Sequence, residues 1–332
     1  EGAVSAIFKS TIDTSGQIGG VNTNGIDITG DDITFEGAVT TAGDGAVTID
    51  NAGLLTIDTG AAFDVDGDFT QVSSNASGTV EIGDNITADG NITFGDTNYG
   101  TSVVLTGAVH LSTENQRGDI TFYGTVNGTA AGSESLTMTA LRDVTFKGAV
   151  GGAVDAVDNT VNVGRLGTID IVNARHVTVE STSSIVAASL LQRAGSGITT
   201  FNGEIDTNDS VPLPTQATGS YGVSIDSKDL ALNNTITTTG GGRVVFNQTD
   251  TIDIAALGDI TADGEVSMTA TNGISTAGNV TTTDDNITFA SATTLTGSIE
   301  LVTAGVDSGN IEFTQTLNAA NVGTEGLTLD AG

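Results

Sequence analysis

Cysteine and tryptophan are absent from the 332 residues, proline occurs twice, and lysine and arginine together occur nine times. Without cysteine the chain can form neither a disulfide framework nor a thiolate metal site, and it has no nucleophilic thiol. The few basic residues face 41 acidic ones, so the formal net charge is −32. A basic groove that follows phosphates is therefore excluded, and we expect no nucleic-acid partner.

Long hydrophobic runs are also missing. No stretch approaches the roughly 18 consecutive apolar residues of a membrane-spanning helix, and residues 1–4 show neither the basic nor the apolar part of a signal peptide. We therefore expect no membrane span. The lack of cysteine fits an exported protein, which crosses a membrane unfolded and is spared wrong disulfides.

Glycine is abundant instead, with 45 residues, and 37% of the residues are hydrophobic. This apolar content is too high for a solvated acidic tail, so the chain should fold despite its charge. One phrase recurs along it: a turn residue, then Ile or Val, then Thr, then Phe. Copies end at Phe35, Phe94, Phe122, Phe146 and Phe289, a variant with Glu in place of Thr ends at Phe313, and looser copies end at Phe201 and Phe246.

These phenylalanines mark a repeat. Eight of the eleven stand at this position of the phrase, and their spacing fits one or two units of roughly 21–29 residues. We expect them to form one column inside the protein. Between the phrases, apolar residues alternate with Thr, Asp or Asn, as in residues 46–49 and 54–57, which predicts half-buried strands. No window shows the apolar spacing of a helix.

A unit this short cannot bury its own apolar side, so neighbouring units must stack to build a continuous core. The sequence therefore predicts an all-β fold without substantial helix. We expect a parallel β-helix, or β-solenoid, whose rungs of roughly 21–29 residues lie about 4.8 Å apart. The alternative is a chain of β-sandwich modules of about 90 residues each. It is less favoured, because the period here is much shorter and proline is nearly absent from the joints.

We expect residues 1–332 to form one continuous solenoid segment of a longer array. The first four residues match residues 36–39, which follow a marker phenylalanine, and the last six form a strand that elsewhere precedes one. A longer repeat relates residues 92–138 to residues 287–329 at an offset of about 190 positions, which indicates duplication of a block of rungs.

Residues 206–221 interrupt the pattern. Both prolines, Pro212 and Pro214, lie in this segment between polar residues. Because proline cannot donate to a strand ladder, we expect the segment to be a loop that projects from a corner of the solenoid.

The phrasing of residues 118–128, 136–140 and 143–152 resembles the β-strand repeats of giant bacterial surface proteins, the filamentous-haemagglutinin-like adhesins. The resemblance implies a parallel β-helix shaft that is secreted across the outer membrane and serves adhesion or filament formation at the cell surface. We expect a non-enzymatic protein whose partners are further copies or segments of the same array, end to end, together with surface glycans or a host or neighbouring cell. The resemblance carries over no catalytic residue, because the shared motif is a strand pattern.

Carboxylates are the main candidates for a binding site. Asp64, Asp66 and Asp68 alternate along a predicted strand, so their side chains should point the same way, and hard oxygen ligands suit calcium. We name these three as a candidate calcium site and expect no other cofactor. The calcium-loop pattern that ends in a bidentate Glu is absent. The alternative interpretation is that repeated corners favour Asp and Asn for their backbone conformation and hydrogen bonds.

Two further functions have to be weighed. The alternative to a shaft is a carbohydrate-active β-helix enzyme or a carbohydrate-binding β-solenoid. The enzyme would need two carboxylates across a cleft. The acidic pairs at 31–32 and 284–285 precede strands of the repeat, so we interpret them as turn residues. Ice binding would need Thr-x-Thr in register over many rungs, and the runs at 237–239 and 281–283 are expected to be too isolated for it.

Overall fold

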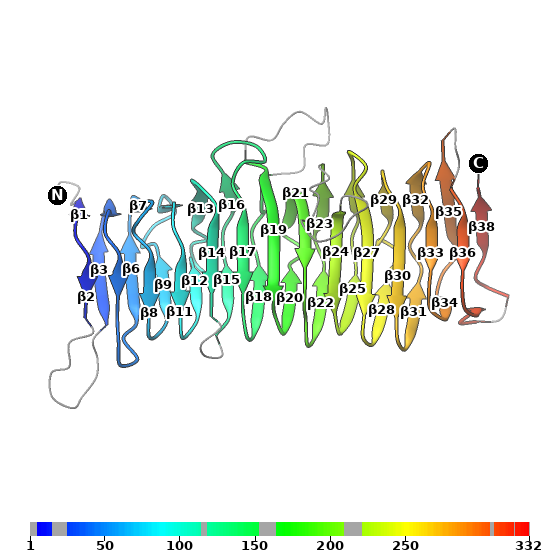
Figure 1. Ribbon diagram of the computed structural model, residues 1–332, viewed down its shortest axis with the longest axis horizontal. Coiled ribbons are helices and arrows are strands. Elements are labelled where there is room, and N and C mark those ends of the chain that lie inside the picture. The colour runs from blue at the N-terminus through cyan, green and yellow to red at the C-terminus, as the bar shows by residue number, and fades with distance from the viewer. Residues whose placement is uncertain are drawn as a thin grey trace. The chain divides into compact units, whose positions relative to one another are not determined.

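The computed structural model describes residues 5–14, 25–113, 118–152, 164–208, 221–305, 309–321 and 323–331. These residues form strands, turns and bends and contain no helix, which confirms the predicted all-β class. The chain divides into two compact units, the N-terminal unit of residues 1–175 and the C-terminal unit of residues 176–332. Figure 1 labels the strands of each unit.

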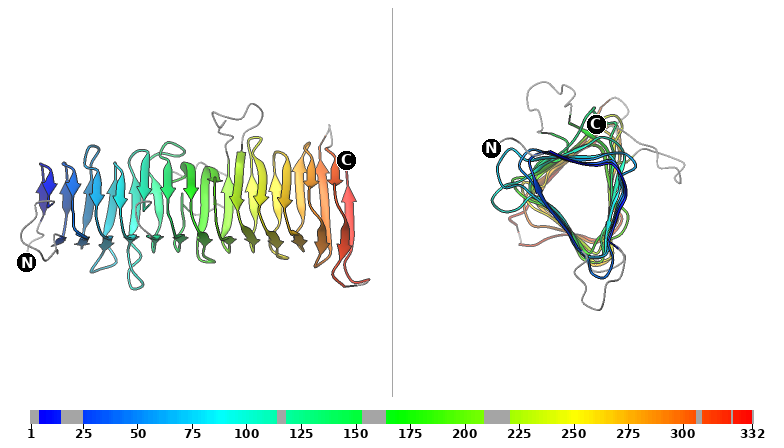
Figure 2. Two further views of the ribbon diagram at one scale, coloured as in Figure 1. Left: turned by 60° about the horizontal axis from the view of Figure 1, so that its bottom comes forward. Right: turned by 90° about the vertical axis from the view of Figure 1, so that its left-hand side faces the viewer.

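The N-terminal unit consists of three parallel sheets that the chain visits in rotation. Sheet N1 contains β1 (Ala6–Phe8), β4 (Ile33–Phe35), β7 (Leu54–Ile57), β10 (Thr79–Ile82), β13 (Ser102–Leu105) and β16 (Val126–Gly128). Sheet N2 contains β2 (Ile12–Asp13), β5 (Val39–Thr40), β8 (Phe63–Val65), β11 (Ile86–Ala88), β14 (Val109–Ser112), β17 (Leu136–Thr139) and β19 (Leu166–Asn173). Sheet N3 contains β3 (Ile26–Gly30), β6 (Val47–Asn51), β9 (Phe69–Val72), β12 (Ile92–Phe94), β15 (Ile120–Phe122) and β18 (Asp143–Phe146). Seen end-on, this unit has a triangular outline with one sheet on each side (Figure 2).

The C-terminal unit repeats the same plan. Sheet C1 contains β20 (His176–Val179), β22 (Ile198–Phe201), β25 (Asp229–Leu232), β28 (Thr251–Ile254), β31 (Gly273–Thr276), β34 (Thr293–Leu295) and β37 (Leu317–Ala319). Sheet C2 contains β21 (Ser184–Gln192), β23 (Glu204–Thr207), β26 (Ile236–Thr238), β29 (Ile260–Ala262), β32 (Val280–Thr283), β35 (Ile299–Ala304) and β38 (Leu327–Asp330). Sheet C3 contains β24 (Tyr221–Ser227), β27 (Arg243–Gln248), β30 (Val266–Ala270), β33 (Ile287–Phe289) and β36 (Ile311–Phe313), and the end of β21 pairs with β24.

Within each unit a strand generally pairs in parallel with the strand one rung later, so the predicted β-solenoid is confirmed. The rung length varies more than the repeat suggested. Ile274 pairs with Thr293, which closes a short rung, whereas Leu136 pairs with Ile169, which closes a much longer one. The strands keep their parallel pairing in both cases.

The core of each unit lies inside the three sheets. Strands bury every second residue, as in β6, where Val47 and Ile49 are fully buried and Thr48 and Asp50 face outward. Each rung alone would leave its apolar side open to water, whereas stacked rungs cover one another. Nine phenylalanines are among the largest side chains that are fully buried.

The marker phenylalanines do not share one sheet, although ring contacts link them inside the N-terminal unit. Phe35 contacts Phe63 at 5.1 Å, Phe63 contacts Phe69 at 5.5 Å, and Phe69 contacts Phe94 at 5.6 Å. Phe94, Phe122 and Phe146 do stack on sheet N3, with ring centroids 5.3 and 5.6 Å apart. Phe35, from the same phrase, lies on sheet N1 and stacks on Phe8 at 4.9 Å. The phrase specifies a strand whose first and third residues face the core and whose second faces outward, and such a strand fits any of the three sheets. The lengths of the corners decide which sheet a given copy joins.

Three predictions about organisation stay predictions. The first is that residues 1–332 form one continuous solenoid, which depends on how the two units join. For the proposed duplication, both segments begin with an Ile-Thr-Phe strand and reach the next marker phenylalanine after visiting two other sheets. For the loop at 206–221, β23 ends at Thr207 and β24 begins at Tyr221, and both prolines lie outside the described residues.

Candidate functional site

Asp and Asn side chains link successive rungs at the corner that precedes sheet N3. Oδ1 of Asp68 accepts the backbone N–H of Asn91 at 2.6 Å, and Oδ1 of Asn91 accepts that of Asp119 at 2.9 Å. Oδ1 of Asp119 in turn accepts the N–H of Asp143 at 3.1 Å. Each side chain thus satisfies a backbone donor one rung later, which a corner cannot do for itself. We call these four residues the N3 corner ladder.

Arginines neutralise the last carboxylates of the N3 corner ladder. The Arg175 guanidinium donates two hydrogen bonds to Asp143, at 2.8 and 2.6 Å, and Nε of Arg142 lies 3.4 Å from Asp119. All four side chains remain partly exposed. The bidentate geometry fixes the corner more firmly than a single contact would.

The candidate calcium residues lie around one corner, but they engage different neighbours. Asp64 faces outward and is exposed on β8, while Asp66 and Asp68 follow that strand. Oδ2 of Asp66 accepts the N–H of Asp44 on the preceding rung at 2.9 Å, whereas Asp68 binds Asn91 on the following one. Across the described ranges, no three His, Cys, Asp or Glu side chains gather as metal ligands. Asp66 and Asp68 therefore act as corner residues here, and calcium binding by the three stays a prediction.

Other acidic pairs also serve corners, as the sequence suggested. Oδ1 of Asp32 accepts the N–H of Leu54 one rung later at 2.9 Å. Asp44 and Asp284 adopt left-handed backbone conformations with φ of 62° and 60°, and both lie in corners. Aspartate tolerates this conformation better than most residues, which explains its frequency at these positions.

Acidic side chains of two neighbouring rungs meet at the corner between sheets C2 and C3. Burial raises the pKa of Asp285, and the charges of Glu265, Asp263 and Asp284 raise it further, while Arg243 opposes them. Nη2 of Arg243 lies 2.7 Å from Glu265, and its guanidinium lies over the Tyr221 ring. The sequence pattern singled out the pair at 284–285 but missed Glu265. Its place one rung before Asp285 in the repeat is the signal that could have found it.

Replacing Asp285 with asparagine is expected to raise the free energy of unfolding at pH 7 by about 0.5 kcal/mol. Because the raised pKa means that the folded state binds this proton more tightly, the carboxylate lowers stability above the pKa of unfolded aspartate, about 3.9. The gain should therefore shrink as the pH falls toward 4. Urea unfolding of the full chain at pH 7 and 4 measures it. Asp253→Asn, at an exposed position of sheet C1, is the control and should show no comparable gain at pH 7.

The outer face of sheet N3 carries a threonine column. Register partners on five successive rungs are Thr48, Thr70, Thr93, Thr121 and Thr145, all half-buried. On sheet C2, Thr261 stands in register with Thr237 and Thr281. Asp263 stands where the second threonine of Thr-x-Thr would be on the middle strand. The expectation that the two runs are too isolated for ice binding stays a prediction. On sheet N3 the residue two positions before each of the last four threonines belongs to the N3 corner ladder, as Asp68 does for Thr70. That sheet therefore does not present Thr-x-Thr on these rungs.

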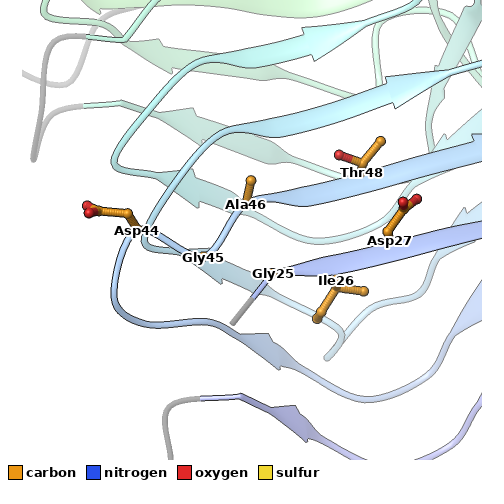
Figure 3. Close-up of a pocket in the computed structure, with 7 residues that line it drawn as sticks. All are labelled: Gly25, Ile26, Asp27, Asp44, Gly45, Ala46 and Thr48. Carbon is orange, nitrogen blue, oxygen red and sulfur yellow. The ribbon is translucent and has the colours of Figure 1, made fainter. Parts of the chain in front are cut away.

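One shallow hollow of about 360 Å³ lies at the first rungs of the N-terminal unit. Figure 3 shows its lining, with Asp27 and Thr48 on adjacent strands and Asp44 at the corner. Its polar side chains are two carboxylates and one hydroxyl, with no basic, aromatic or nucleophilic partner among its lining residues.

Comparison with protein-family models, with curated proteins and with solved structures gives no match. The resemblance to filamentous-haemagglutinin-like adhesins therefore stays a prediction from the repeat phrase. In the part of the chain that the structure describes, no helix could cross a membrane.

Proposed function

We propose that this protein is a non-enzymatic segment of a bacterial surface protein, a structural or adhesive shaft or filament that works outside the cell. The observation that carries the proposal is the N3 corner ladder, in which Asp68, Asn91 and Asp119 each accept a backbone N–H one rung later. Side chains that fill this role hold rungs together and are not free for chemistry. A stack of such rungs gains length without needing a new fold for each addition.

The same stacking suggests the partners. Each rung offers the next one parallel strand pairing, a stacked apolar interior and corner acceptors, so further copies or segments of the array can continue it end to end. The acidic lateral surfaces of two such stacks repel each other, which disfavours their side-by-side association. Surface glycans or a host or neighbouring cell are the partners that an adhesive role adds.

The location can be tested on intact cells of the source bacterium. Antibodies raised against this segment should label unpermeabilised cells, and added protease should remove the signal. An antibody against a cytoplasmic protein should give no signal until the cells are permeabilised. Labelling that appears only after permeabilisation would contradict the proposal.

A carbohydrate-active enzyme is the second candidate, and the corner of Asp285 is the observation that favours it. A carboxyl of raised pKa beside the ion-paired Glu265 resembles an acid and a carboxylate with separate roles. The shaft proposal predicts that no reducing ends are released when the protein is incubated with a panel of polysaccharides. Release that Glu265→Gln and Asp285→Asn both abolish would favour the enzyme.

A further inference from the structure

Nine Asn-x-Ser or Asn-x-Thr tripeptides without proline occur in the sequence, and this tripeptide is the acceptor motif for N-linked sugars. The motif alone is weak evidence, because a repeat rich in Asn and Thr produces it often. A folded protein can carry the sugar where the asparagine is exposed and its amide nitrogen holds no neighbour. The serine of the copy at Asn208 lies outside the described residues, so the structure allows eight copies to be compared.

Five of these eight copies fail one of the two conditions. Asn127, Asn233 and Asn247 donate from Nδ2 to a neighbouring side chain, at 3.3, 2.9 and 3.0 Å. A sugar on that nitrogen would compete with the contact. Asn75 and Asn91 are half-buried.

The other three asparagines meet both conditions and share one geometry. Asn85, Asn279 and Asn286 are exposed. Oδ1 of each accepts a backbone N–H from the next rung, at 2.8 Å in all three cases. Among the described residues, none accepts a hydrogen bond from Nδ2 of these three. The amide oxygen is therefore fixed to the corner, while the nitrogen holds no neighbour.

The hydroxyl residue of each motif faces the same way as its asparagine. Thr87, Thr281 and Thr288 are outward-facing, half-buried residues of β11, β32 and β33. Residues two positions apart in a strand point to the same face. A transferase that reads both side chains of the motif can therefore reach them from the outer side of the sheet.

We propose that Asn85, Asn279 and Asn286 are N-glycosylation sites. The donor is a nucleotide-linked or lipid-linked sugar. Nδ2 bonds to the anomeric carbon and loses one proton, while the bond from that carbon to the donor's phosphate oxygen breaks and the phosphate leaves with the electron pair. The product keeps the amide oxygen, so the hydrogen bond to the next rung survives. The proposal requires only a cell that contains such a transferase, and it holds for a shaft and for an enzyme alike.

Peptide mass spectrometry of the protein purified from its source cells tests the proposal. We expect the added mass of a hexose or an N-acetylhexosamine on at least one of the three asparagines. Asn310 is the matched control within the same chain. It is exposed and begins the same phrase one rung after Asn286, but Glu312 stands where the motif needs Ser or Thr. Asn310 should therefore carry no sugar.

Two variants at Thr288 show whether the motif directs the modification. Thr288→Ala should remove the sugar from Asn286, whereas Thr288→Ser keeps the hydroxyl and should retain it. The same pair of substitutions at Thr87 or Thr281 serves if the sugar is on another of the three sites. Circular dichroism checks that each variant folds. Three results would overturn the proposal: none of the three asparagines carries a sugar, Asn310 carries one as often as they do, or the alanine variant leaves the modification unchanged.

Discussion

Phe122→Ala is expected to lower the free energy of unfolding by about 3–5 kcal/mol. Phe122 is 1% exposed, and its ring stacks between those of Phe94 and Phe146. The backbones on either side are held apart by the strand ladder of sheet N3, so the cavity cannot collapse without breaking parallel hydrogen bonds. The substitution also removes two stacked aromatic contacts, which contribute beyond the area they bury.

Tyr123→Ala is the matched control, because it removes an aromatic ring from the very next residue. Tyr123 is only half-buried and outside the core, where Nζ of Lys147 lies 4.0 Å from its ring centroid. Its loss should cost about 1 kcal/mol or less. Urea unfolding followed by far-ultraviolet circular dichroism compares the two variants. Equal losses would contradict the inward and outward assignment of β15 and its flank.

The alternation of apolar and polar residues was enough to predict the strands and their stacking. In β6 and β15 every apolar residue is buried, and Asn51 at the end of β6 is buried with them. The short period left parallel stacking as the way to bury them. The sheet that each strand joins could not be predicted, because Phe35 and Phe94 end the same phrase and yet lie on sheets N1 and N3.

The hydrogen-bond partners at the corners could likewise be predicted only in part. The preference of Asp and Asn for corners was predictable from their backbone tolerance. The partner of Asp68, which is Asn91 one rung later, was not, because the step along the chain between register partners changes from rung to rung. The burial of Gln248 was predictable by contrast, because it alternates with Val244 and Phe246 along β27 and shares their inward side.

The buried side-chain amide of Asn51 has a hydrogen-bond partner for its nitrogen and for its oxygen, and it allows a sharper test of the core. Asn51, at the end of β6, is fully buried. Its Nδ2 donates to the carbonyl oxygens of Gly53 at 2.8 Å and Thr79 at 3.0 Å, and its Oδ1 accepts from Nε2 of Gln71 at 2.7 Å. One side chain therefore satisfies groups on its own rung and on the next one. An amide can do this because it offers donors and an acceptor together.

Asn51→Asp is expected to destabilise the protein by about 3–5 kcal/mol at pH 7. The new carboxyl group fits the same space and can still accept from Gln71. When ionised, however, it has no donor for the two carbonyl oxygens and places a desolvated charge against them. Burial raises the pKa of this carboxyl above the value of about 3.9 in the unfolded chain.

The pH dependence separates this charge from the lost hydrogen bonds. Below pH 3.9, roughly the unfolded pKa, the carboxyl is protonated in both states and can donate once, so most of the loss should disappear. Between that pH and the raised folded pKa the loss grows with pH, and above the folded pKa it stays constant. Asn51→Leu also loses the hydrogen bonds but carries no proton, so its loss should not vary with pH relative to the parent. Urea unfolding of the parent and both variants between about pH 3 and 8 measures the difference. A loss for Asn51→Asp that is the same at every pH would mean that water reaches this corner and that the sealed interior described for sheet N3 is wrong.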